Sequence, residues 1–132
     1  MDWDGDGTLQ HGTGGDDTYG FSPIGNSSTK FNSNGYDGNE KTISNLFINR
    51  PTTDYIGLFG RTSSCIIDNL GLIDVNITGN NGVGALSGYD YVSSNVTNCY
   101  STGNVDGYNN EVGGLIGENW AEIDNCYSSS KM

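Results

Sequence analysis

The first six residues of the chain hold three alternating aspartates, Asp2, Asp4 and Asp6, followed at once by Gly7. This spacing is the opening of a calcium loop, because a hard cation needs several carboxylate and carbonyl oxygens close together. A complete loop of that type has a glutamate at its twelfth position, which is Thr13 in this sequence. The alternative is an acidic turn at the end of a strand. Calcium at Asp2, Asp4 and Asp6 is therefore one of two hypotheses for this stretch.

The chain has three cysteines, Cys65, Cys99 and Cys126, and one histidine, His11. An odd number of cysteines does not indicate a disulfide scaffold, and the absence of a CxxC pair disfavours zinc. Cys99 and Cys126 stand at equivalent places in two related segments, which predicts small buried residues stacked in a core. A disulfide between them is the alternative. The chain has no G-x-S-x-G and no H-E-x-x-H pattern, so we expect no catalytic residues.

Aromatic residues are the best candidates for binding a ligand. They lie in the variable stretches between the repeated segments: Tyr89, Tyr91, Tyr108 and Trp120. Aromatic faces beside acidic side chains suit stacking against sugar rings, whereas the alternative is packing over the edge of the fold. The partners we expect are therefore a glycan or another surface protein.

These residues belong to a sequence that repeats itself. The last glycine of the first half of each copy is Gly60, Gly88 or Gly117, with steps of 28 and 29 residues. The second half of each copy, and a shorter relative before the first copy, carries an asparagine, with steps of 24, 29 and 27 residues: Asn45, Asn69, Asn98 and Asn125. Self-similarity at such a period indicates a repeat array in which each copy is one structural unit.

The asparagine of each copy lies between two apolar residues that are three positions apart, as in Ile123-Asp124-Asn125-Cys126. In a straight strand this spacing would place the two apolar side chains on opposite faces. Asparagine tolerates the left-handed conformation, so a corner at this residue keeps both neighbours inside. Stacked asparagines then form a hydrogen-bonded ladder, unless each one only fits its own turn.

The first half of each copy predicts core positions. A leucine recurs there, at Leu58, Leu86 and Leu115, beside glycines that allow close approach of the backbone. The copies consist of short β-like runs interrupted by Gly, Asn and Asp, and no window keeps a helical period. These features predict an all-β fold with little or no α-helix.

The repeated phrase resembles the GLUG motif, a prokaryotic cell-surface repeat. The resemblance rests on Gly113-Gly114-Leu115-Ile116-Gly117 and on Asn98-Cys99-Tyr100-Ser101-Thr102-Gly103-Asn104-Val105, and it covers about residues 21–130. It implies a parallel β-helix, and right-handed crossovers are favoured for parallel strands. It also implies a module of surface adhesins or secreted peptidases with no catalytic residues of its own.

By length the chain is one domain, residues 1–132, which we expect to form a β-solenoid of four to five coils. We assign residues 1–28 to a glycine-rich segment and loop, and residues 29–54 to the first coil. The three GLUG-like repeats follow at 55–82, 83–111 and 112–132. The array looks cut at both ends, so we expect either a piece of a longer chain or ends that stack on other copies.

The charge of the chain excludes two classes of partner. The formal net charge is −11, with five Lys and Arg against 16 Asp and Glu. Nucleic acids and anionic membranes both need basic patches, and no apolar run is long enough for membrane insertion. No signal peptide is apparent at the start. Three glycosylation sequons, at Asn26, Asn76 and Asn95, are acceptors only where the source glycosylates its surface proteins.

Three functions remain. The first is a non-enzymatic extracellular or cell-surface module that binds a glycan or protein through its loops, or serves as a stiff spacer. The second is a self-assembling subunit of a filament, joined by end-to-end β-pairing. The third is a polysaccharide-cleaving enzyme on a β-helix scaffold, for which paired carboxylates would be required.

Overall fold

The computed structural model describes residues 19–131, and these residues contain ten β-strands and no helix. The strands are β1 (Tyr36–Ser44), β2 (Phe47–Asn49), β3 (Phe59–Thr62), β4 (Ile66–Gly79), β5 (Ser87–Asp90), β6 (Asn95–Thr97), β7 (Tyr100–Gly107), β8 (Ile116–Asn119), β9 (Glu122–Asp124) and β10 (Tyr127–Lys131). No helix among the described residues could cross a membrane.

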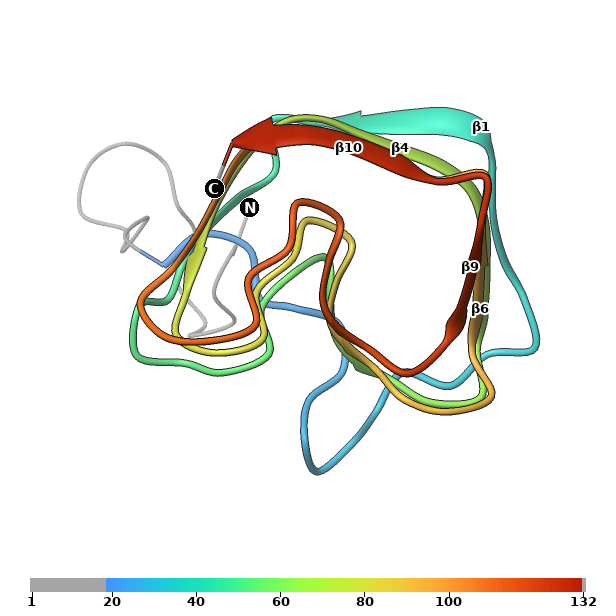
Figure 1. The fold of residues 1–132 in the computed structure, drawn as a ribbon, viewed down its shortest axis with the longest axis horizontal. Coiled ribbons are helices and arrows are strands. Elements are labelled where there is room, and N and C mark those ends of the chain that lie inside the picture. Colours follow the sequence, from blue (N-terminus) through green and yellow to red (C-terminus); the bar gives the residue numbers. More distant parts are fainter. Residues whose placement is uncertain (1–18, 132) are drawn as a thin grey trace.

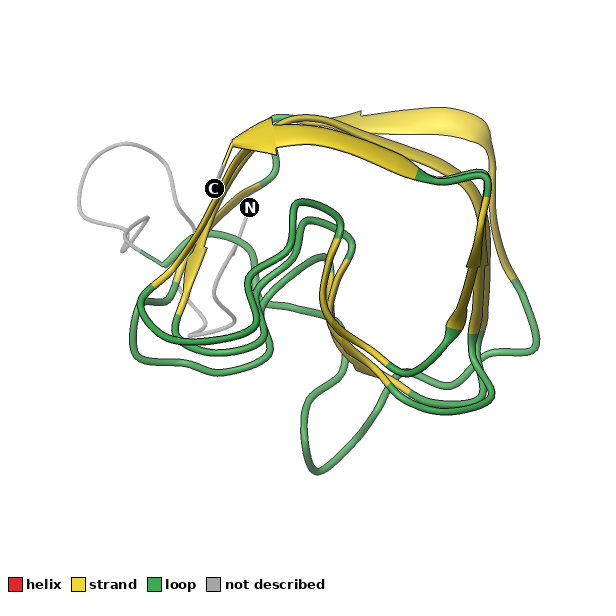
Figure 2. Cartoon of the chain, viewed as in Figure 1, coloured by secondary structure: helices red, strands yellow, loops and turns green. Residues whose placement is uncertain are grey.

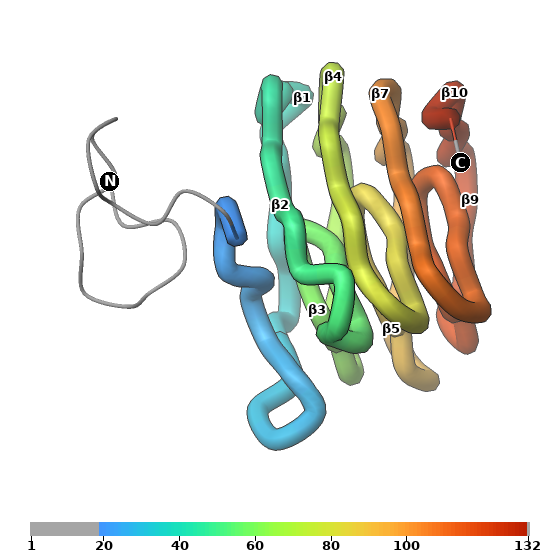
Figure 3. Tube along the Cα trace, turned by 90° about the vertical axis from the view of Figure 1, so that its left-hand side faces the viewer, coloured from blue at the N-terminus to red at the C-terminus, as the bar shows by residue number. Residues whose placement is uncertain are grey.

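Every strand pairs in parallel with a strand of a neighbouring coil, so the chain is a parallel β-solenoid (Figures 1 and 3). One sheet contains β10, β7, β4, β6 and β9, with β1 and β2 added on β4, and a second contains β3, β5 and β8. Ile67 pairs with Val96, and Val96 pairs with Ile123. The repeat period of the sequence is therefore the length of one coil.

The walls of each coil meet at corners with left-handed backbone. At the first corner Asn69, Asn98 and Asn125 have φ values of 58°, 52° and 51°. Asn98 separates β6 from β7 and Asn125 separates β9 from β10, while Asn69 stands at the same corner within the continuous strand β4 (Figure 1). The corner therefore requires a residue whose backbone adopts the left-handed conformation at low cost, as asparagine does.

The structure corrects the placement of Asn45. Ser44 pairs with Ile73, and the amide of Asn45 donates to the Ile73 carbonyl, so Asn45 stands level with Asp74 at a second corner. Asn45 and Asp74 both have positive φ there, as has Gly103 of the following coil. The sequence comparison aligned Asn45 with Asn69 because both corners show the same apolar–Asn–apolar pattern.

Between two walls the backbone folds inward, into the interior of the coil (Figure 2). This inward fold is built by the first half of each copy, and in the last coil its tip reaches the opposite wall. The Ser101 hydroxyl donates to the Gly114 carbonyl over 2.8 Å. A β-carbon on Gly114 would collide with the side chain of Ser128, so the tip needs a residue without one.

The core runs along the solenoid inside the walls. Leu58, Leu86 and Leu115 are buried, as predicted from their recurrence. So are Cys99 and five apolar residues of the long strand β4: Ile67, Leu70, Leu72, Val75 and Ile77. The described solenoid has about three turns, fewer than the four to five expected. Residues 20–31 contribute only isolated bridges to the neighbouring coil, because this polar, glycine-rich stretch lacks the apolar pattern of a full coil.

Candidate ligand-binding surface

Three of the four predicted aromatic residues gather on one surface, built on and just after strands β5 and β8. The rings of Tyr89 and Tyr91 are stacked with centroids 5.9 Å apart, and Tyr55 meets Tyr89 edge-on at 5.5 Å. The Trp120 amide donates to the Asp90 carbonyl over 2.9 Å, which places Trp120 beside Tyr91 in the next coil. We call this set the aromatic surface: Tyr55, Tyr89, Tyr91 and Trp120, with Arg61 and Glu118.

Arg61 lies between two of these rings. Its guanidinium carbon is 4.8 Å from the ring centre of Tyr55 and 4.6 Å from that of Tyr89. Such stacking fixes the plane of the guanidinium group and is favourable for a cation. Among the described residues Arg61 forms no ion pair, and its buried Nε has no hydrogen-bond partner. The guanidinium group is therefore oriented by the rings, and no carboxylate of residues 19–131 neutralises it.

The other end of the aromatic surface is acidic. Arg61 pairs with Tyr89 and Tyr89 with Glu118, so the three side chains form one row across β3, β5 and β8. The indole Nε1 of Trp120 donates to the Glu118 carboxylate over 2.7 Å. Desolvation, and then the charge of Glu118, raise the pKa of the Tyr89 phenol, while Arg61 acts in the opposite direction.

Tyr108 lies apart from these residues. It follows strand β7 and lines a separate depression with Thr78 and Asp106. Sequence reasoning grouped it with the others because it is also an aromatic residue between repeats. The same reasoning missed Arg61 and Glu118. Each is one repeat period away from Tyr89 in the sequence, which could have indicated that the three residues lie in one row.

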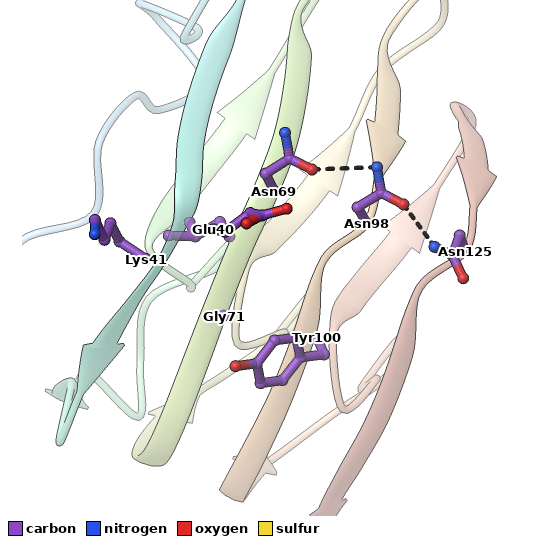
Figure 4. A pocket seen from close by; sticks show the side chains of 8 residues that line it. Glu40, Lys41, Asn69, Gly71, Asn98, Tyr100 and Asn125 are labelled. Carbon is purple, nitrogen blue, oxygen red and sulfur yellow. Dashed lines mark hydrogen bonds between the residues drawn. The ribbon is translucent and has the colours of Figure 1, made fainter.

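A second surface lies at the corner formed by Asn69, Asn98 and Asn125, which we call the amide corner (Figure 4). A pocket of about 380 Å³ opens beside it, with Glu40 and Lys41 at its far side. Nδ2 of Asn98 donates to Oδ1 of Asn69 over 3.2 Å, and Nδ2 of Asn125 donates to Oδ1 of Asn98 over 2.6 Å.

The amide corner is largely satisfied by its own hydrogen bonds. Asn98 Nδ2 also donates to Asp68 Oδ1, over 3.1 Å, so both of its hydrogens are used. Asn69 Nδ2 donates to Asp37, and the hydrogen bond from the Asn39 backbone amide, followed by this bond, lowers the pKa of the Asp37 carboxyl. Little hydrogen-bonding capacity is left for a ligand, so these residues serve the fold.

Below the amides, the floor of the pocket is the backbone at Gly71. The rings of Tyr100 and Tyr127 stack with centroids 5.1 Å apart and planes 6° apart. Gly71 lies in the preceding coil, where it pairs with Tyr100. The Tyr100 ring covers the place where a β-carbon of Gly71 would stand. The tyrosine stack therefore ends on the backbone of Gly71, and Tyr100 and Gly71 both line the pocket.

A second run of stacked amides escaped the sequence analysis. Asp54 Oδ1 accepts from Nδ2 of Asn80 over 2.8 Å and from Nδ2 of Asn81 over 3.1 Å. Asn80 Oδ1 then accepts from Asn109 of the next coil, over 3.1 Å. The signal was the Asn-Asn pair that occurs at 80–81 and again one period later at 109–110.

Other predicted residues have clear positions. Cys99 and Cys126 are free thiols in neighbouring coils, and the Cys99 amide donates to Cys126 Sγ over 3.5 Å. Burial raises the pKa of Cys99 to about 11. The described residues include no cluster of metal ligands, while Asp2, Asp4 and Asp6 lie outside them. Of the sequon residues, Asn26 and Asn76 are exposed and Asn95 is half-buried.

One acidic side chain points into the solenoid rather than toward solvent. Asp90 is fully buried, and its Oδ1 accepts from the Thr62 hydroxyl over 2.6 Å. Its Oδ2 has no partner among the described residues. Burial raises the pKa of this carboxyl, against the effect of the Thr62 hydrogen bond. Asp90 lies beneath the aromatic surface and is inaccessible to a ligand.

These features define the chain as a parallel β-solenoid repeat protein with one candidate binding surface. Residues 108–131 match the family model described as the GLUG motif, so this part of the chain is a GLUG motif. The resemblance seen in the sequence is thereby confirmed.

Halomucin of Haloquadratum walsbyi is 39% identical over 104 residues, which are 76% of this chain and 1% of that protein. The chain thus spans only a small fraction of the curated relative that it matches. No solved structure matches the chain.

Proposed function

We propose that the chain is a non-enzymatic extracellular or cell-surface module of a prokaryote that binds glycans through its aromatic surface. The GLUG motif and the similarity to Halomucin support a surface module. The observation that carries the binding role is the aromatic surface itself. Its outermost members remain accessible, since Tyr91 is 41% and Trp120 63% exposed. Accessible aromatic side chains of this kind present an apolar face and a polar tip to a ligand.

The solenoid gives such a surface a rigid base. Each residue of the row stands on a strand that is hydrogen-bonded to its neighbours, and sites on strands are held more precisely than sites on loops. A spacer role follows from the same architecture, because each coil contacts only the coils beside it.

The test is binding of the purified chain to an array of neutral and acidic oligosaccharides, followed by titration of the ligands that bind. Trp120→Ala should weaken binding by about fivefold through loss of aromatic contact. Tyr108→Ala is the matched control, since Tyr108 is also an exposed aromatic residue but lies on another part of the molecule. Absence of binding to every oligosaccharide would refute the proposal.

A second candidate function, end-to-end assembly, is favoured by the exposure of core positions in the last coil. Ile123 is 44% exposed, whereas Val96 and Ile67, its counterparts in the two preceding coils, are 0% and 1% exposed. A further coil of the same register would cover Ile123 and pair with β8, β9 and β10. Another copy of this chain is the occupant we propose.

Sedimentation over a range of concentrations tests this assembly. Ile123→Asp places a charge in the proposed contact and should abolish the growth of assemblies with protein concentration. Ile66→Asp is the control, because Ile66 is similarly exposed, at 47%, but lies on strand β4, which already pairs with β6. Repeating the measurement with a chelator tests whether calcium at Asp2, Asp4 and Asp6 contributes. A monomer at all concentrations would exclude assembly.

A further inference from the structure

Arg61 is distinguished from the other described cationic residues by its place between two aromatic rings. Only five residues are cationic against 16 acidic ones, yet Arg61 has no carboxylate partner among the described residues. The nearest acidic residue of its row, Glu118, is two strands away and is bonded to Trp120. An oriented guanidinium group without a counter-ion is suited to a planar, bidentate acceptor such as a carboxylate.

The protein's own cations already use part of the aromatic surface. Arg61 occupies the faces of Tyr55 and Tyr89, and the Lys30 ammonium lies 5.8 Å from the ring centre of Tyr91. Trp120, at the far end, has no cation over its ring among the described contacts and is 63% exposed. Sugar stacking therefore belongs at the Trp120 end, and recognition of a charge belongs at the Arg61 end.

The two ends are separated by a length that suits a short oligosaccharide. Neighbouring strands are about 4.8 Å apart, so residues two strands apart, such as Arg61 and Glu118, are separated by roughly 10 Å. This is longer than one sugar ring and is suited to a disaccharide laid along the solenoid axis. Glu118 disfavours a negative charge of the ligand at the Trp120 end. The surface therefore has a positive end at Arg61 and a negative end at Glu118.

We propose that the aromatic surface selects acidic glycans in which uronic and neutral sugars alternate, with the carboxylate on Arg61 and the neutral sugar beside Glu118 and Trp120. This inference rests on the proposed glycan-binding function and specifies its ligand class. The carboxylate accepts from the guanidinium group in a charge-assisted hydrogen bond, the type that contributes most per contact.

The experiment compares two probes by calorimetry at low salt. One is a tetrasaccharide of alternating glucuronate and N-acetylglucosamine, and the other is the same tetrasaccharide with each carboxyl reduced to an alcohol. The acidic form should bind at least about tenfold more tightly, the difference expected from one charge-assisted hydrogen bond. Arg61→Gln should remove this preference, so that the variant binds the acidic and the reduced form with equal affinity.

Two further variants make the outcome unambiguous. Lys41→Gln removes one positive charge on another wall, beside the amide corner, and should retain the preference. Glu118→Gln removes the repulsive charge and should strengthen binding of the acidic probe, so the test survives if Arg61→Gln fails to fold. Equal binding of both probes would overturn the inference and leave glycan binding intact, whereas no binding of either would refute both.

Discussion

The amide corner and the aromatic surface are two rows of side chains built by the same repeat, but their chemistry is opposite. At the amide corner, identical residues meet one coil apart, and Asn69, Asn98 and Asn125 bond to one another. On the aromatic surface different residues meet, so Arg61, Tyr89 and Glu118 stand in one row. The corner satisfies its own polar groups, and the surface leaves a cation and an indole ring available.

This difference suggests how a solenoid separates structure from function. Where the sequence repeats faithfully, each residue finds its partner in the next coil and stabilises the stack. On the aromatic surface the sequence varies within one register, and there Arg61 finds no carboxylate partner among the described residues and can meet a ligand. Substitutions on the two rows should therefore have opposite consequences for folding and for binding.

The largest effect on stability should follow from Asn98→Ala at the amide corner. Asn98 is the central amide, with hydrogen bonds to both neighbours and to Asp68. Alanine loses these bonds and must adopt a φ of about 52°. We expect a loss of about 2–3 kcal/mol in the free energy of unfolding, measured by chemical denaturation.

Asn98→Gly separates the two causes of that loss, because glycine adopts the left-handed corner without strain but makes no side-chain bonds. It should cost less than Asn98→Ala. An equal cost for both variants would show that backbone strain contributes nothing at this corner.

An intermediate effect should come from the buried acid beneath the aromatic surface. Asp90 has a raised pKa in the native state, so the folded protein binds the proton of this carboxyl more tightly than the unfolded chain does. Its contribution to stability is complete at low pH and is lost as pH rises from the ordinary aspartate range through the raised native pKa. Asp90→Asn should therefore stabilise the protein at pH 7, by about 1 kcal/mol, and change little near pH 3.

Thermal melting of both proteins across this pH range measures the effect. The Asp90→Asn gain should grow with pH and then level off. A gain independent of pH would mean that the unpaired Oδ2, rather than the ionisation of the carboxyl, is responsible.

The smallest effect on stability should come from the aromatic surface. Trp120→Ala removes an exposed side chain that, among the described residues, hydrogen-bonds only to Glu118, itself half-buried. Its free energy of unfolding should change by less than about 0.5 kcal/mol, measured by denaturation beside the glycan titration. A loss as large as that of Asn98→Ala would contradict the division of roles between the two rows.

The sequence by itself determined the features that depend on local conformation and on the period. Recurring Leu58, Leu86 and Leu115 predicted core positions, and the apolar–Asn–apolar pattern predicted a corner, because φ preference and strand alternation act over a few residues. The step of 27–29 residues predicted one coil per copy. These are properties that any stacked arrangement of the copies would share.

Only the tertiary structure decided which corner each asparagine occupies and which side chains meet between coils. Asn45 stands at the second corner because residues 41–44 of β1 pair with β4 residues 29 positions later, whereas alignment of Asn45 with Asn69 needs a step of 24. Arg61 met Tyr55 because the inward fold returns the chain beside its own preceding residues, as the close approach of Gly60 to the Tyr55 carbonyl shows. Contacts of this kind depend on how the coils stack, since stacking joins residues that sequence spacing leaves far apart.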